Sequence, residues 1–94
     1  MRDEKLRARI NELAGGSVVM LDSPSFDRSV VGISYDDRVI YSWRTMVLET
    51  MHDYSCSYND ATEFISYSIL RATPYMNDNS PIIVMYDRSD IREG

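Results

Sequence analysis

The chain has 94 residues, of which 44% are hydrophobic and 27% charged, with one cysteine and a net charge of −5. This length allows one domain with a single modest core, and the composition excludes wholesale disorder. One cysteine excludes an internal disulfide, and no apolar run approaches the roughly 18 residues that a membrane span needs, so we expect a soluble, cytoplasmic protein.

The charge is unevenly distributed. Residues 1–9 carry four basic and two acidic groups, so the remainder carries six basic and thirteen acidic groups. Binding to duplex DNA depends on clustered Lys and Arg, and we therefore expect no direct contact with nucleic acid. The acidity suits a basic protein surface, including one that normally holds nucleic acid, although solubility alone is a simpler explanation.

Residues 2–14 are predicted to form an amphipathic helix that ends at Gly15-Gly16. Asp3 and Arg7 are expected to pair on its surface, four residues apart. Its apolar stripe is narrow and consists of Leu6, Ile10 and Leu13. We therefore expect the helix to lie outside the core or to dock on a second copy.

Three short strands are predicted next. SVVML (17–21) is a β-branched apolar run, and SVVGIS (29–34) and RVIYSW (38–43) flank the tight turn YDD as a hairpin. Gly32 inside the first hairpin strand indicates a bulge or a close backbone approach. The loop over 22–29 separates the lone strand from the hairpin.

Two helices follow, over about 43–54 and 60–73. Ser42 is the expected N-cap of the first, and Asp60 with Glu63 resembles an acidic capping box for the second. The positions of the second helix expected to be buried are Ala61, Phe64, Ile65, Tyr67, Ile69 and Leu70.

The last apolar stretch, PIIVMY (81–86), is predicted to be a central strand covered on two sides, and the polar tail 87–94 is expected to fray. The order is α-β-β-β-α-α-β. It predicts one α+β domain over residues 1–94, with a three- to four-stranded, mainly antiparallel sheet and helices packed on it.

The chain's only histidine and only cysteine, His52 and Cys56, lie four residues apart. On a continuous helix they would share a face and could hold a metal or form a thiolate–imidazolium pair. No other Cys or His can complete a zinc site, and the polar run SCSYND favours a helix end between them. We therefore interpret His52 as a residue of a helix C-terminus and Cys56 as a loop residue.

The loop LDSPSFDRS (21–29) offers Asp22 and Asp27 to a cation and three serines to a phosphate. Its spacing matches neither an EF-hand nor a P-loop, and turns explain the same residues. Phe26 is expected to fix this loop to the core. We assign no catalytic, cofactor-binding or metal-binding residue anywhere in the chain.

An acidic, tyrosine-rich helical surface is the best candidate for function. Tyrosine is enriched in the hot spots of protein interfaces. The candidate interaction residues are Glu49, Asp53, Tyr54, Tyr58, Asp60, Glu63 and Tyr67. The alternative is that these rings only cap a small core, with their hydroxyls in water.

The segments LDSPSFDRSVVGIS, DRVIYSW, VLETMHDY, DATEFISYSILRATPYM and PIIVMYD resemble a family of small acidic proteins encoded on phages, plasmids and integrated elements of gut Firmicutes. The resemblance runs from about residue 17 to 87. The relatives are more acidic across 50–60 and lack the pair of His52 and Cys56. The resemblance implies an accessory factor, such as an inhibitor of a CRISPR effector, an antitoxin or a transcriptional modulator, and it carries no functional residue over.

Together these features predict a non-enzymatic, anti-CRISPR-like accessory protein that binds a host or element protein with a basic surface. The alternatives are a structural or regulatory homo-oligomeric module, in which two copies pair, and a small-molecule-binding protein that uses residues 21–29 and 52–60.

Overall fold

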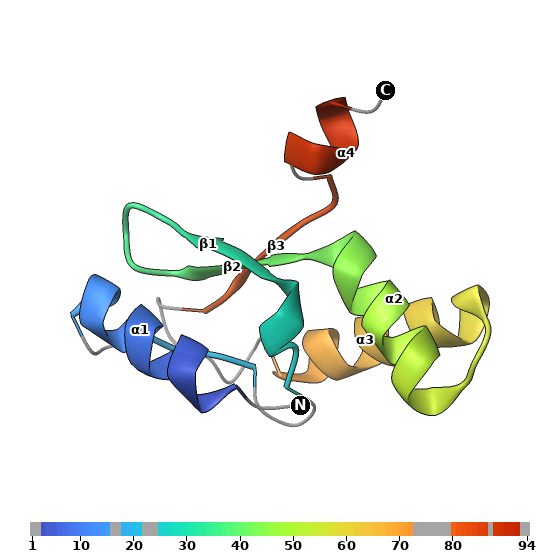
Figure 1. Ribbon diagram of the computed structural model, residues 1–94. Coiled ribbons are helices and arrows are strands. Elements are labelled where there is room, and N and C mark those ends of the chain that lie inside the picture. The colour runs from blue at the N-terminus through green and yellow to red at the C-terminus, as the bar shows by residue number, and fades with distance from the viewer. Residues whose placement is uncertain (1–2, 16–17, 22–24, 73–79, 87, 93–94) are drawn as a thin grey trace.

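A three-stranded sheet flanked by helices organises the computed structural model, which describes residues 3–15, 18–21, 25–72, 80–86 and 88–92. Its elements, in chain order, are helix α1 (Glu4–Ala14), the 3-10 turn η1 (Asp27–Ser29), strands β1 (Val30–Ile33) and β2 (Val39–Ser42), helices α2 (Trp43–Tyr54) and α3 (Tyr58–Ala72), strand β3 (Ile82–Val84) and helix α4 (Arg88–Arg92). The hairpin β1–β2, α1 and the pair α2–α3 surround the core, and α4 stands beyond the end of β3 (Figure 1). The predicted α+β class is confirmed.

The sheet is mixed, with the order β1-β2-β3. Strands β1 and β2 are antiparallel, whereas β2 and β3 are parallel, with Ile40 opposite Ile82 and Ser42 opposite Val84. The prediction of a mainly antiparallel sheet therefore needs correction. The connection through α2 and α3 returns the chain to the end of the sheet where β2 began, and such a crossover is what a parallel pair requires.

The central strand is β2, and the prediction that residues 81–86 form it is wrong. Val39 and Tyr41 on β2 are fully buried, whereas every residue of β3 is only half-buried, at one edge of the described sheet. The prediction relied on hydrophobicity alone and therefore chose the wrong central strand, because the order of strands in the sheet depends on the crossover connection.

The predicted hairpin is confirmed, with a turn over residues 35–37 in which Asp37 has a φ of 61°. The register between β1 and β2 shifts between Val30 and Gly32, which is the expected bulge. Both features are set by local sequence signals.

The predicted strand over 17–21 is not present in the described residues 18–21, which have no regular structure. The backbone N–H of Leu21 donates to the hydroxyl of Tyr41 at 3.0 Å, and its carbonyl accepts from the guanidinium of Arg7 at 2.8 Å. Two side chains therefore supply the hydrogen bonds that a neighbouring strand would have made.

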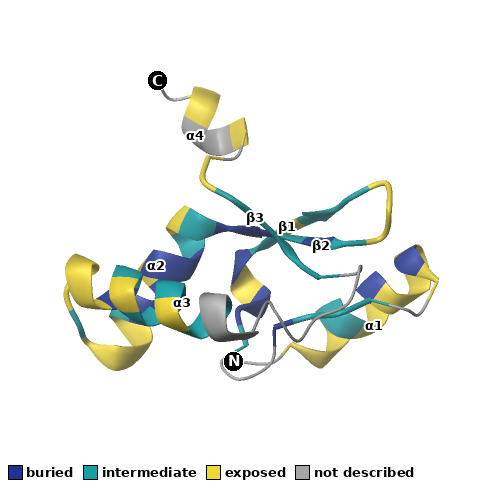
Figure 2. Cartoon of the chain, turned by 180° about the vertical axis from the view of Figure 1, so that it is seen from behind, coloured by how far each residue is buried: buried dark blue, intermediate teal, exposed yellow. Residues whose placement is uncertain are grey.

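Helix α2 begins as predicted, because the hydroxyl of Ser42 accepts from the N–H of Thr45. Its inner face buries Met46 and Val47 against α3, where Ala61 and Ile65 are fully buried (Figure 2). These residues belong to the core cluster that the two helices share.

Helix α3 starts two residues before the predicted boundary. The hydroxyl of Ser57 accepts from the N–H of Asp60 at 3.1 Å, so Ser57 is the cap and Asp60 lies in the first turn. Tyr67, expected to be buried, has 63% of its surface exposed. Leu70 lies outside the described side chains.

Helix α1 packs on its own chain through Ile10 and Ala14, while Leu13 points into solvent. The expected surface pair of Asp3 and Arg7 does not form. Asp3 caps the helix by accepting from the N–H of Leu6, and Arg7 binds the buried carboxylate of Asp27. An inward-pointing arginine thus fixes α1 to the loop before β1.

The C-terminal segment that was expected to fray contains α4. This short helix lies apart from α1, α2 and α3 in both views (Figures 1 and 2). Its contacts with the other described elements are sparse, and 71% of the surface of Ile91 is exposed.

Candidate functional site

His52 and Cys56 do not form a joint site. Helix α2 ends at Tyr54, and Ser55 adopts a left-handed conformation with a φ of 50°, so the two residues do not share one helical face. The ring of His52 is exposed and contacts the carboxylate of Asp53 at 3.3 Å. The thiol of Cys56 is instead turned toward the core, 3.8 Å from the carbonyl of Thr50. The interpretation of a helix end followed by a loop residue is confirmed.

Asp27 in the loop 21–29 is bound by the side chain of Arg7 and by the backbone of Asp3. Its two carboxylate oxygens accept from Nε and a terminal nitrogen of Arg7, both at 2.8 Å, and one of them also accepts from the N–H of Asp3 at 2.7 Å. Burial acts to raise the pKa of Asp27, but these hydrogen bonds and the charge of Arg7 outweigh it and lower the pKa below its ordinary value. Asp27 is a structural anion, and Asp22 lies outside the described residues.

Phe26 is 97% buried beside Asp27, as expected of a residue that fixes the loop to the core. Ser29, at the end of this loop, is fully buried and donates to the carboxylate of Glu49 at 3.0 Å. The loop is therefore joined to α2 as well as to α1. In the part of the chain that the structure describes, no three His, Cys, Asp or Glu side chains come together as a metal site.

Glu49 was predicted to be an interaction residue, and the structure contradicts this. Only 7% of its surface is exposed, and its carboxylate bonds to Ser29 behind α2. Its negative charge led to the prediction that it is exposed. Glu49 instead lies next to Thr50 on the inner side of α2, where it accepts a hydrogen bond from the hydroxyl of Ser29. It belongs to the buried polar structure.

The other six candidate residues are exposed and lie on α2 and α3. Three of them are tyrosines with more than half of their surface exposed, and three are carboxylates. We call these exposed residues the acidic tyrosine surface; they are Asp53, Tyr54, Tyr58, Asp60, Glu63 and Tyr67. Tyr58 lies on the opposite side of α3 from Tyr67 and lines a different hollow, so the set spans more than one side of the helix pair.

An aromatic contact joins the two helices within this surface. The rings of Tyr54 on α2 and Phe64 on α3 lie 5.2 Å apart at an interplanar angle of 49°, a favourable tilted geometry. This contact fixes one of the tyrosines while leaving 58% of its surface exposed. An exposed ring that packs on a second ring is suited to binding, because part of its conformational entropy is already lost.

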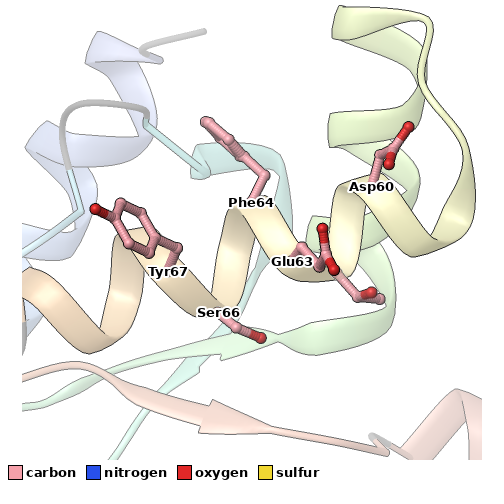
Figure 3. Close-up of a pocket in the computed structure, with 6 residues that line it drawn as sticks. Asp60, Glu63, Phe64, Ser66 and Tyr67 are labelled. Carbon is pink, nitrogen blue, oxygen red and sulfur yellow. The ribbon is translucent and has the colours of Figure 1, made fainter.

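A shallow hollow of about 730 Å³ runs along α3. Four of its lining residues, spaced i, i+3, i+4 and i+7, lie along one side of the helix (Figure 3). We call them the α3 stripe; they are Asp60, Glu63, Phe64 and Tyr67. Two carboxylates and two aromatic rings on one stripe are suited to a partner that presents positive charge beside apolar carbon.

A second, more enclosed hollow of about 280 Å³ was not foreseen. It lies where β2 and β3 end and is lined by Trp43, Arg44, Val47, Leu48, Tyr58, Met85 and Tyr86. Trp43 directly follows β2, and Met85 directly follows β3. Sequence reasoning missed this hollow because it did not predict that the two strands run parallel and end side by side.

Comparisons with protein-family models, with curated proteins and with solved structures found no match to this chain. Within the described residues, no helix is both long enough and apolar enough to cross a membrane. The resemblance to proteins of mobile elements therefore stays a hypothesis.

Proposed function

We propose that this chain is a protein-binding module whose acidic tyrosine surface docks on a basic surface of a partner protein. The observation that carries the proposal is the exposure of six candidate residues on one pair of packed helices. Interface hot spots favour tyrosine, and complementary charge speeds association and selects partners.

The charge balance of these helices supports a basic partner. Between residues 43 and 64, Arg44 is the only basic residue other than His52, whereas Asp53, Asp60 and Glu63 are all exposed. The three carboxylates thus face solvent, and these two helices contribute only Arg44 and His52 as basic residues over this stretch. Such a surface attracts a basic partner through water, and the attraction weakens as salt is added.

In its concrete form, the proposal is an accessory protein of a mobile element that inhibits a nuclease by occupying a basic channel for nucleic acid. This version rests on the net charge of −5 and on the family resemblance. The cytoplasm is the proposed compartment, because a lone cysteine stays reduced there.

The test is affinity capture from a host lysate with the wild-type chain and a D53K/E63K variant. The control, E4K/E12K, changes the net charge equally on the exposed side of α1. A true partner binds the wild type and the control, is lost with D53K/E63K, and elutes as salt is raised. Partners that bind all three chains equally contradict the proposal.

The nuclease version has its own readout. A captured partner should bind DNA or RNA when alone, and the wild-type chain should displace that nucleic acid where D53K/E63K does not. If the partner binds nucleic acid equally well in the presence of saturating wild-type chain, the chain does not inhibit by occupying the nucleic-acid channel. The proposal of docking on a basic surface would then still stand.

A further inference from the structure

Helix α4 carries an amphipathic face that is largely exposed in the described part of the chain. Arg88, Ile91 and Arg92 are spaced i, i+3 and i+4, so they lie on the same side of the helix, and all three are exposed. A helix of five residues is not stable alone in water, because helical stability comes mainly from packing an amphipathic face. Its contacts within the chain are sparse, so a further packing partner would stabilise α4.

The α3 stripe has the complementary chemistry. Asp60 and Glu63 match the two arginines in charge, and Phe64 with Tyr67 offers aromatic surface to the apolar side chain of α4. Among the described residues, no ion pair involves either arginine of α4 or either carboxylate of the stripe. Charges of both signs are thus available on two separate elements of one chain.

We propose that the chain forms a homodimer in which α4 of each copy docks on the α3 stripe of the other. Arg88 and Arg92 pair with Asp60 and Glu63, while Ile91 packs on Phe64 and Tyr67. Within one copy, α4 stands apart from α3 in both views, so a second copy is the occupant that supplies both halves of the contact (Figures 1 and 2). A twofold axis makes the exchange reciprocal, and the assembly closes at two copies.

The dimer would cover Asp60, Glu63 and Tyr67, which belong to the acidic tyrosine surface. Self-association and partner binding are then mutually exclusive on this surface, and the monomer is the form that binds. This consequence rests on the proposed function, whereas the dimer itself does not.

The test is sedimentation velocity of the purified 94-residue chain over a concentration series, at low and high salt. The wild type should form dimers that weaken with salt, because exposed ion pairs are screened. R88E/R92E and D60K/E63K should each raise the dimer dissociation constant about tenfold or more, since each places like charges opposite one another. The controls K5E/R9E and E4K/E12K, which change the net charge equally on α1, should dimerise like the wild type.

Mixing the two variants gives the decisive result. In a heterodimer of R88E/R92E with D60K/E63K, one contact pairs Glu with Lys and the other pairs Arg with the native carboxylates. The mixture should therefore dimerise about as well as the wild type, although neither variant does so alone. Circular dichroism of each variant verifies that all of them are folded.

Three results overturn the proposal: a wild-type chain that stays monomeric at every concentration, an R88E/R92E variant that dimerises like the wild type, or a mixture that does not associate. A second variant, I91A, keeps every charge and should weaken the dimer in high salt. A monomeric wild type rejects this dimer without rejecting the proposed function, because lysate capture does not depend on self-association.

Discussion

Arg7 and Asp27 form a two-point ion pair between α1 and the loop before β1. Both contacts measure 2.8 Å, the Asp27 side chain is fully buried and only 12% of the Arg7 side chain is exposed. The planar guanidinium matches a carboxylate in this geometry, so the pair sets the position of the helix as well as neutralising charge. This contact acts together with the burial of Ile10 and Ala14 to hold α1 on its own chain.

Asp27→Asn should destabilise the fold. The substitution keeps the shape of the side chain but removes the negative charge that faces Arg7, and loss of one member of a buried ion pair costs about 3 kcal/mol. Urea denaturation followed by circular dichroism measures it. Asp37→Asn is the control, because that side chain is exposed in a left-handed turn that asparagine also tolerates. Equal midpoints for the two variants would show that the pair contributes nothing.

Stability should fall as the pH drops below about 4, the ordinary range of an aspartate. The pKa of Asp27 is lower in the folded chain than in the unfolded chain, so its contribution is complete above the unfolded pKa. As the pH falls through the folded pKa, the carboxylate takes up a proton and this contribution is lost. Urea midpoints between pH 6 and pH 3 should decline less in Asp27→Asn; parallel curves for the two proteins contradict the assignment.

The cap of α3 gives a direct test of a corrected boundary. Ser57→Ala removes the hydroxyl that accepts from the N–H of Asp60, and loss of such a cap costs about 1 kcal/mol. Asp60→Ala should cost less, because Asp60 sits in the first turn and caps nothing in the structure. Thermal unfolding of both variants compares them, and a larger loss for Asp60→Ala would restore the predicted capping box.

Ser29 and Glu49 should be energetically coupled across the core. Donor and acceptor of their 3.0 Å hydrogen bond are both buried, so Ser29→Ala and Glu49→Ala, each of which removes one partner, should each destabilise the chain. In the double variant the losses should not add, leaving a coupling of about 1–2 kcal/mol. If the two losses of stability simply add in the double variant, the hydrogen bond between Ser29 and Glu49 contributes nothing to stability.

The elements predicted correctly are those with local signals. The hairpin followed from β-branched runs around YDD, the bulge from Gly32, and α2 from the cap at Ser42. Local periodicity also placed α3, apart from its first turn.

The errors arose where distant residues decide the structure. Strand order depends on a crossover of two helices, and the segment at Leu21 is held by Tyr41 and Arg7 rather than by a neighbouring strand. Glu49 was assigned to the surface by its charge, although Ser29, twenty residues away, supplies its partner. None of these contacts has a signature within a short window of sequence.

The most direct test of the acidic tyrosine surface is amide hydrogen exchange of the chain with and without a captured partner. The proposed function predicts added protection from Asp53 through Tyr67, with little change in the hairpin β1–β2 on the other side of the molecule. Protection confined to the hairpin or to α1, with none across α3, would contradict it.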